Sequence, residues 1–468
     1  MKLIRRFFAV DNLIPKKLRK NPLPSTKEAY FTAFQMAWPS SMEMVLIGLI
    51  GSADLIMVSH LGSGAIAAAG ITTQPKFILL ALVMALNTGL TVIISRRKGQ
   101  DRQAEANKIL MSALILSVSI SFLMSLIGFI FAEPILLMSG ATTDYIDLAV
   151  PYFRAIAVGN FFTAVAMTLT SAQRGAGNTK ISMVTNLTAN VVNIIFNYLL
   201  IYGIGFFPEM GVVGAGIATM IGNIVAFIIS IYSITRKGNF VSLVFKGNMS
   251  LDFTRVSELI RVSSSAFIEQ IFIRGGFLVF AIIIAKLGTD NFATHQVVVN
   301  ILNLAFAVGE GLSIASATLV GMSLGKERPD LAMLYSLILQ RIGLFVALIL
   351  GFNLIVFRTT ILSLFSQGNS IVLTLGNPIM IIVGLVVSFQ VLGTITIGTL
   401  RGGGDLKFTA FLMMTCIGVI RPVAGYLFAI SFAGGLMGAW FAILLDQAMR
   451  TIISQRRFAD GSWLSIVI

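Results

Sequence analysis

Residues 174–180 read Arg-Gly-Ala-Gly-Asn-Thr-Lys, and residues 401–407 read Arg-Gly-Gly-Gly-Asp-Leu-Lys. Other short matches lie at nearly the same spacing, 224 to 227 residues apart: Glu43 with Glu269, Leu61-Gly62 with Leu287-Gly288, Lys98-Gly99 with Leu324-Gly325, and Gly214-Ala215 with Gly438-Ala439. A spacing this constant over most of the chain is the mark of an internal duplication. The sequence therefore predicts two similar halves that share one fold.

Long apolar runs fill the chain between these matches. Of the 468 residues, 56% are hydrophobic and 12% charged, and the mean hydropathy is +0.90. A soluble chain of this length would need more polar surface. Each run can cross a hydrocarbon core of about 30 Å as a helix, and none alternates polar with apolar residues as a barrel strand does. We expect twelve transmembrane helices, centred near residues 45, 84, 120, 160, 192, 224, 273, 309, 345, 387, 419 and 444.

Each half thus has an even number of spans, so both halves begin on the same side of the membrane. The sequence predicts an all-α polytopic membrane protein whose two parallel six-helix lobes form a V-shaped cleft, with the substrate path between them. The expected parts are a basic arm (1–30), an N-lobe (31–235), a cytoplasmic linker (236–261), a C-lobe (262–455) and a cytoplasmic tail (456–468).

The formal net charge of +14 is unevenly distributed along the chain. Lysine and arginine gather in the arm, the even-numbered connections and the C-terminal end. Only Lys76, Lys286 and Arg358 fall in odd-numbered connections. The positive-inside rule then puts both termini in the cytoplasm and the chain in the cell membrane. We expect the basic segments, including residues 16–20, to face anionic lipid headgroups and not nucleic acid.

Cysteine and histidine are too scarce for most site chemistry. The single Cys416 excludes structural disulfides, and His60 and His295 are far apart, which disfavours a metal site of these residues. The chain contains no Walker-type phosphate loop. We therefore expect neither an enzyme nor a bound cofactor.

Ionisable residues inside spans are functional candidates because they are costly at membrane depth. In the first span, Glu43 and Asp54 are eleven residues apart and so lie on one helical face. A carboxylate that faces a cavity can bind H⁺ or Na⁺. The alternative for Asp54 is an outer-leaflet group that simply reaches water.

The fifth span carries a stripe of four amides on one helical face: Asn186, Asn190, Asn193 and Asn197. Unpaired amides facing lipid would be costly, so the stripe should face protein or water. It could position a water molecule or a cation beside Asp54. The alternative is interhelical hydrogen bonding worth about 0.6 kcal/mol per contact.

Spans 7 and 8 carry Glu269, Arg274 and a second stripe of Asn300, Asn303 and Glu310. These residues could form a second cation or substrate site. The alternative is a buried glutamate–arginine pair with a structural role. In spans 10 and 11, Gln390 and Arg421 could line a cavity, and a structural pairing explains Arg421 equally well.

These residues resemble the multidrug and toxic compound extrusion (MATE) family over roughly residues 30–460. The resemblance rests on several motifs in this order: Ala53-Asp54-Leu55-Ile56-Met57-Val58, Gln173-Arg174-Gly175-Ala176-Gly177, Asn193-Ile194-Ile195-Phe196-Asn197-Tyr198, Ala293-Thr294-His295-Gln296 and Leu400-Arg401-Gly402-Gly403-Gly404-Asp405. It implies antiport of H⁺ or Na⁺ against cationic or lipophilic drugs by rocking of the two lobes.

The resemblance also implies roles for single residues. Asp54 matches a cation-site carboxylate, with the amide of Asn193 beside it, which makes Na⁺ a candidate ion there. The position of Asn197 is Asp in some members. Glu269 matches a glutamate of the Na⁺-coupled bacterial branch, but that branch has an Asp where this chain has Gln390, so the C-lobe site and the coupling ion stay open.

We therefore expect a monomeric secondary exporter that couples cation entry to drug export. The alternative is a lipid-linked saccharide flippase or another exporter of related fold. Such a flippase usually has more spans and a more cationic cavity.

Overall fold

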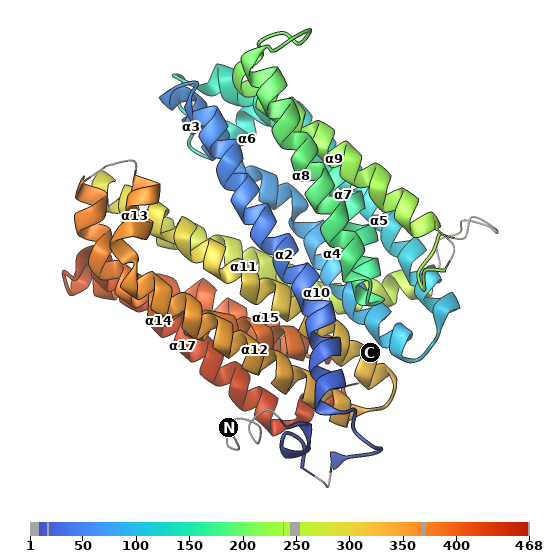
Figure 1. The fold of residues 1–468 in the computed structure, drawn as a ribbon. Helices are drawn as coiled ribbons and strands as arrows, with labels where there is room; N and C mark the ends of the chain where they lie inside the picture. Colours follow the sequence, from blue (N-terminus) through green and yellow to red (C-terminus); the bar gives the residue numbers. More distant parts are fainter. Residues whose placement is uncertain (1–8, 16–17, 237, 244–252, 367–369, 467–468) are drawn as a thin grey trace. The chain divides into compact units, whose positions relative to one another are not determined.

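The computed structural model describes residues 9–15, 18–236, 238–243, 253–366 and 370–466. Helices joined by short connections make up the described chain (Figure 1). The first half contains η1 (Val10–Asn12), α2 (Thr26–Ser59), α3 (Ser63–Ile71), α4 (Thr73–Gly99), α5 (Gln103–Ile130), α6 (Ala132–Met138), α7 (Ile146–Gly175), α8 (Thr179–Tyr202) and α9 (Gly211–Thr235). The second contains α10 (Phe253–Ala285), α11 (Thr289–Gly325), α12 (Pro329–Val356), α13 (Arg358–Ser366), α14 (Ser370–Gly402), α15 (Leu406–Met413), η3 (Met414–Ile420), α16 (Arg421–Tyr426), η4 (Leu427–Ser431), α17 (Gly435–Asp460) and η5 (Ser462–Ser465).

The twelve predicted spans are confirmed. Eleven segments of the described residues are long and apolar enough to cross a membrane, and each contains one of the expected centres from 84 to 444. The expected centre at 45 falls in α2, whose 34 residues exceed the roughly 20 that a membrane crossing needs. The chain is an all-α polytopic membrane protein.

The chain divides into two compact units, which we describe separately. The N-unit is Val45–Phe267, and the C-unit is Met1–Met44 together with Ile268–Ile468. Helices α2 and α10 therefore each contribute residues to both units. The lobes expected at 31–235 and 262–455 describe the duplicated halves, and their boundaries stay a prediction.

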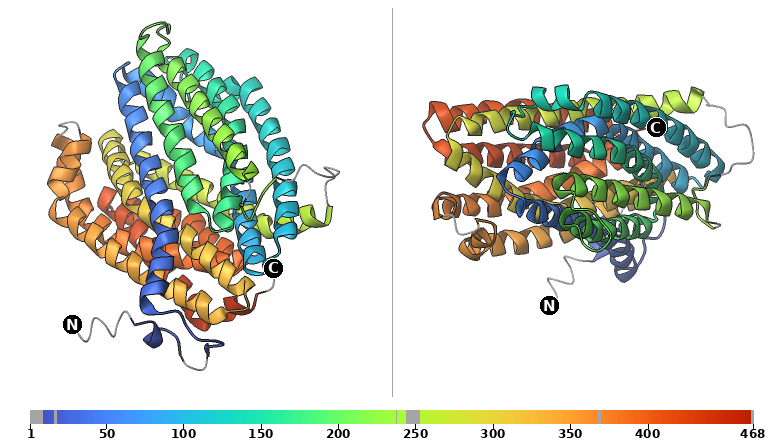
Figure 2. Two further views of the ribbon diagram at one scale, coloured as in Figure 1. Left: turned by 45° about the vertical axis from the view of Figure 1, so that its right-hand side comes forward. Right: turned by 90° about the horizontal axis from the view of Figure 1, so that it is seen from above.

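Helix α7 is the centre of the N-unit, where it packs against α4, α5 and α9. Helix α8 packs along α9, and the two stay neighbours in the left view of Figure 2. Gly222 makes this approach close, because a Cβ there would lie 2.8 Å from the carbonyl oxygen of Ala189. Phe153, Ile201 and Val212 are buried in one hydrophobic cluster of the N-unit.

Helix α14 is the centre of the C-unit, in contact with α11, α12 and α17 (Figure 1). The first part of α2 joins this unit, since a Cβ on Gly311 would come 2.2 Å from Cα of Ser41. Val10 and Ile14 of the basic arm are buried in the same core. Part of the arm therefore packs against protein, while residues 1–8, Lys16 and Lys17 lie outside the described residues.

The eleventh span is irregular. Two π-helical segments, η3 and η4, flank the short α16 that begins with Arg421-Pro422. Proline has no N–H to donate to the carbonyl four residues earlier, so the hydrogen-bond pattern must change around it. Such π segments are common at functional sites. Helix α10 packs tightly here, because a Cβ on Gly276 would lie 2.2 Å from the carbonyl oxygen of Ile417.

Candidate functional site

Two of the predicted amides form a buried polar cluster between α8 and α9. The Asn197 amide donates to Oδ1 of Asn193 at 3.3 Å, and the Asn193 amide donates to Oγ1 of Thr219 at 3.2 Å. Thr219 in turn donates to the carbonyl of Ala215. Asn193 and Asn197 are both buried, whereas Asn186 and Asn190 of the same stripe are half-buried. The stripe thus does link two helices, and Thr219 is a member that sequence reasoning missed.

The end of α2 passes close to this cluster. The Tyr202 hydroxyl at the end of α8 donates to the carbonyl of Met57 at 3.5 Å. Val58 and Ile201 belong to one buried cluster, and they follow Asp54 and Asn197 by one helical turn each. This contact between α2 and α8 lies about one helical turn beyond Asp54 and Asn197. The Asp54 side chain lies outside the described residues.

Glu43 and Glu269 occupy matching positions of the duplicated halves, and both are buried. Glu269 lies at the middle of α10 and forms an ion pair with Arg401, which projects from the last turn of α14. A glutamate–arginine pair was one of the two interpretations of this region. The partner of Glu269 in that pair is Arg401 of the repeated glycine-rich motif.

A second set of charges is buried in the middle of spans 11 and 12. Nε of Arg421 donates to Oδ2 of Asp446 at 3.0 Å, and Arg450 donates to the same oxygen at 3.5 Å. All three side chains are less than a tenth exposed. The structural pairing that we considered for Arg421 is therefore present. Sequence reasoning missed Asp446 and Arg450, although their spacing of four residues inside an apolar run was a usable signal.

The remaining candidates of the C-unit have different surroundings. Glu310 is half-buried, and the charges of Arg401, Glu269 and Arg450 act on it. Asn300 and Asn303 on the same helix are exposed, whereas Gln390 of α14 is buried. Glu310 is thus the one of these four that the fold brings to the ion pairs.

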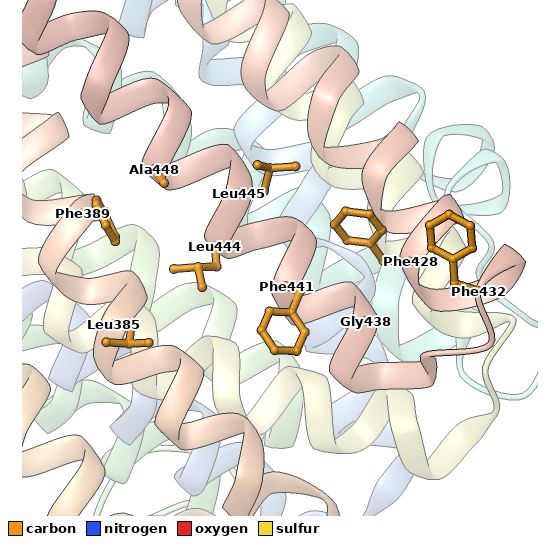
Figure 3. A pocket seen from close by; sticks show the side chains of 9 residues that line it. All are labelled: Leu385, Phe389, Phe428, Phe432, Gly438, Phe441, Leu444, Leu445 and Ala448. Carbon is orange, nitrogen blue, oxygen red and sulfur yellow. The ribbon is translucent and has the colours of Figure 1, made fainter.

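An apolar groove of about 660 Å³ lies in the C-unit, where α17 runs between α14 and η4 (Figure 3). The described residues that line it are Leu385, Phe389, Phe428, Phe432, Gly438, Phe441, Leu444, Leu445 and Ala448. Ligand sites usually add a few polar groups that orient the ligand. This groove offers none among its lining side chains, so it suits hydrocarbon and has no counter-charge for a cation.

Comparisons with known proteins agree on one family. The MatE family model matches residues 39–199 and 265–427. The chain is 26% identical to the "Uncharacterized transporter YisQ" of Bacillus subtilis over 95% of this chain and 98% of that protein. It is also 26% identical to the "Probable multidrug resistance protein NorM" of Thermotoga maritima, over 95% and 96% of the two chains.

Solved structures show the same fold. An outward-facing multidrug resistance MATE family transporter superposes with a TM-score of 0.85 at 20% identity, covering 92% of this chain and 96% of the other. A transporter of the MOP superfamily from Pyrococcus furiosus superposes with a TM-score of 0.87, also at 20% identity, covering 94% and 97%.

Proposed function

Because the chain belongs to the MATE family of membrane transporters, we propose that it exports lipophilic and cationic drugs in exchange for H⁺ or Na⁺. A relative named as a probable multidrug resistance protein, which matches 95% of the chain, supports the drug substrates. The exchange is a secondary active process, driven by the cation gradient across the cell membrane. The basic arm and even-numbered connections support cytoplasmic termini and contact with anionic lipids.

The observation that carries the coupling proposal is the buried polar cluster of the N-unit. Asn193, Asn197 and Thr219 contribute amide and hydroxyl oxygens inside apolar spans. Oxygen donors are the ligands that hard cations such as Na⁺ prefer. The hydrogen bond of Tyr202 to Met57 joins the ends of α8 and α2, about one helical turn beyond Asn197 and Asp54. We assign Asp54 the role of the coupling carboxylate and the two asparagines the role of orienting the ion.

Drug recognition in this proposal depends on apolar surface and on one negative charge. Cationic drugs need a counter-charge, and Asp54 can hold either the drug or the coupling ion but not both. Export then follows from competition, since occupation of the carboxylate by the incoming ion releases the drug. We further propose that one chain is sufficient, because the polar cluster is built within a single N-unit.

Vesicles that contain the purified chain test this function directly. Ethidium transport should require an imposed H⁺ or Na⁺ gradient, and the ion that drives it is the coupling ion. Asp54→Asn should lower the driven rate at least about tenfold, since a neutral amide cannot bind a cation as a carboxylate does.

The matched control is Asp144→Asn, which removes an exposed carboxylate from a loop of the same unit. It should leave the driven rate unchanged. Gradient-independent ethidium movement in the unmutated chain would contradict export by antiport. Normal driven transport by the Asp54→Asn variant would contradict the assignment of Asp54 alone.

A further inference from the structure

Glu269 is a carboxylate in the middle of a membrane-spanning helix, and it is almost fully buried. An ionised carboxylate at such a place is costly unless a positive charge compensates it. The compensating charge can be an exchangeable ion or a side chain of the protein. The structure shows a side chain, because Arg401 forms an ion pair with Glu269.

Two properties of Arg401 favour a lasting pair with Glu269. A guanidinium keeps its positive charge at every physiological pH. It is also tethered to the last turn of α14, in the same unit as Glu269. A tethered partner acts at a high effective concentration, which a dissolved ion must exceed to displace it.

A second buried carboxylate of the C-unit is paired as well. Asp446 is already shared by two guanidiniums, those of Arg421 and Arg450. The two sets of ion pairs contain three guanidiniums and two carboxylates: Arg401 with Glu269, and Arg421 and Arg450 with Asp446. A further positive ion at Glu269 would therefore be repelled by the guanidinium of Arg401.

We propose that Arg401 is a resident counter-cation of Glu269, so that this glutamate exchanges no inorganic cation during transport. Cation exchange is then confined to the oxygen-rich cluster of the N-unit. This inference rests on the proposed antiport, but it concerns only the binding of ions to Glu269. Arg401 is here a specificity-determining residue, because its removal should convert Glu269 into a cation site.

The test is Na⁺ binding by the purified full-length chain, read as the rise in melting temperature when choline is replaced by Na⁺ at constant ionic strength. In the Arg401→Ala variant, Na⁺ should raise the melting temperature by about 2 °C or more beyond the rise that it causes in the unmutated chain. The double variant Arg401→Ala with Glu269→Gln should lose the added rise. Arg401→Lys, which keeps a tethered charge, should add none.

Two results would overturn the proposal. One is an Arg401→Ala variant whose Na⁺ response equals that of the unmutated chain. The other is a Glu269→Gln variant that by itself removes a Na⁺ response of the unmutated chain. If Arg401→Ala does not fold, Arg401→Gln keeps most of the side chain and is judged by the same rule. No drug is present in the assay, so failure of the proposed export function would be seen separately, in the vesicle experiment.

Discussion

Two buried polar sites, one in each unit, differ in charge. In the N-unit, Asn193, Asn197 and Thr219 form a neutral cluster of amides and a hydroxyl. In the C-unit, carboxylates are held by the guanidiniums of the same unit, as in the pair of Asp446 with Arg421. We propose that the neutral oxygen cluster takes up and releases a small cation, whereas the tethered ion pairs do not. The duplication copied the helices, and the chemistry of the two copies then diverged.

The repeated glycine-rich motif carries an arginine at the same position of both halves. Arg401 pairs with the buried Glu269. Its counterpart in the first copy, Arg174, donates to Oγ of Ser171 in its own helix at 3.0 Å. Glu43, the counterpart of Glu269, is buried as well.

The strongest test of the comparison removes the shared anion of the C-unit. Asp446→Asn should lower the free energy of unfolding by about 3–5 kcal/mol, because Arg421 and Arg450 lose their buried counter-charge. Chemical unfolding in mild detergent measures the change. Asp460→Asn, at the exposed end of the same helix, should change it by less than about 1 kcal/mol. Equal effects of the two substitutions would mean that the buried ion pairs do not stabilise the C-unit.

A smaller effect is expected at two adjacent glycines of α10. Gly276→Ala should destabilise the chain by about 1–3 kcal/mol, because the new Cβ would overlap the backbone at Ile417. Gly275→Ala meets no atom within 4 Å and should be neutral or stabilising by up to about 1 kcal/mol. The same unfolding measurement compares them. A similar loss at both positions would show that close packing of α10 on η3 does not support the C-unit.

The smallest change in stability, and the sharpest in function, is expected in the N-unit. Asn193→Ala should cost about 0.6–1.7 kcal/mol, the range for one polar contact between membrane helices. Driven ethidium transport should nevertheless fall at least about tenfold, because an ion ligand is lost. Asn190→Ala, at a half-buried position of the same stripe, is the control and should keep most of the transport. Equal transport by the two variants would mean that the asparagine stripe serves only to pack the helices together.

Much of the fold could be predicted from the sequence because it depends on local properties. Hydropathy over about 20 residues locates a span wherever its neighbours lie. All eleven spans of the described residues were expected at their observed places. Asn190 is half-buried and Asn193 is buried although both belong to one stripe of amides, because burial depends on where α9 lies.

The partners of buried charges could not be predicted in the same way. The sequence made Arg421 a candidate but did not name its partner. Asp446 lies on the next span, and the sequence does not fix how two neighbouring helices align. Glu269 lies five residues from Arg274, yet its ion pair is with Arg401, 132 residues away. Sequence distance says little about such pairs, because the tertiary contacts of α10 with α14 decide which charges meet.

The sequence by itself determined that this chain spans the membrane twelve times, that its halves are copies and that it resembles one transporter family. These properties follow from composition, periodicity and repeated spacing, which the chain carries in any conformation. The tertiary structure alone decided that the C-unit neutralises its carboxylates internally and that the N-unit gathers amides with Thr219. The physical reason is that electrostatic and hydrogen-bonding energies depend on distances of a few ångströms between helices, and no single helix contains that information.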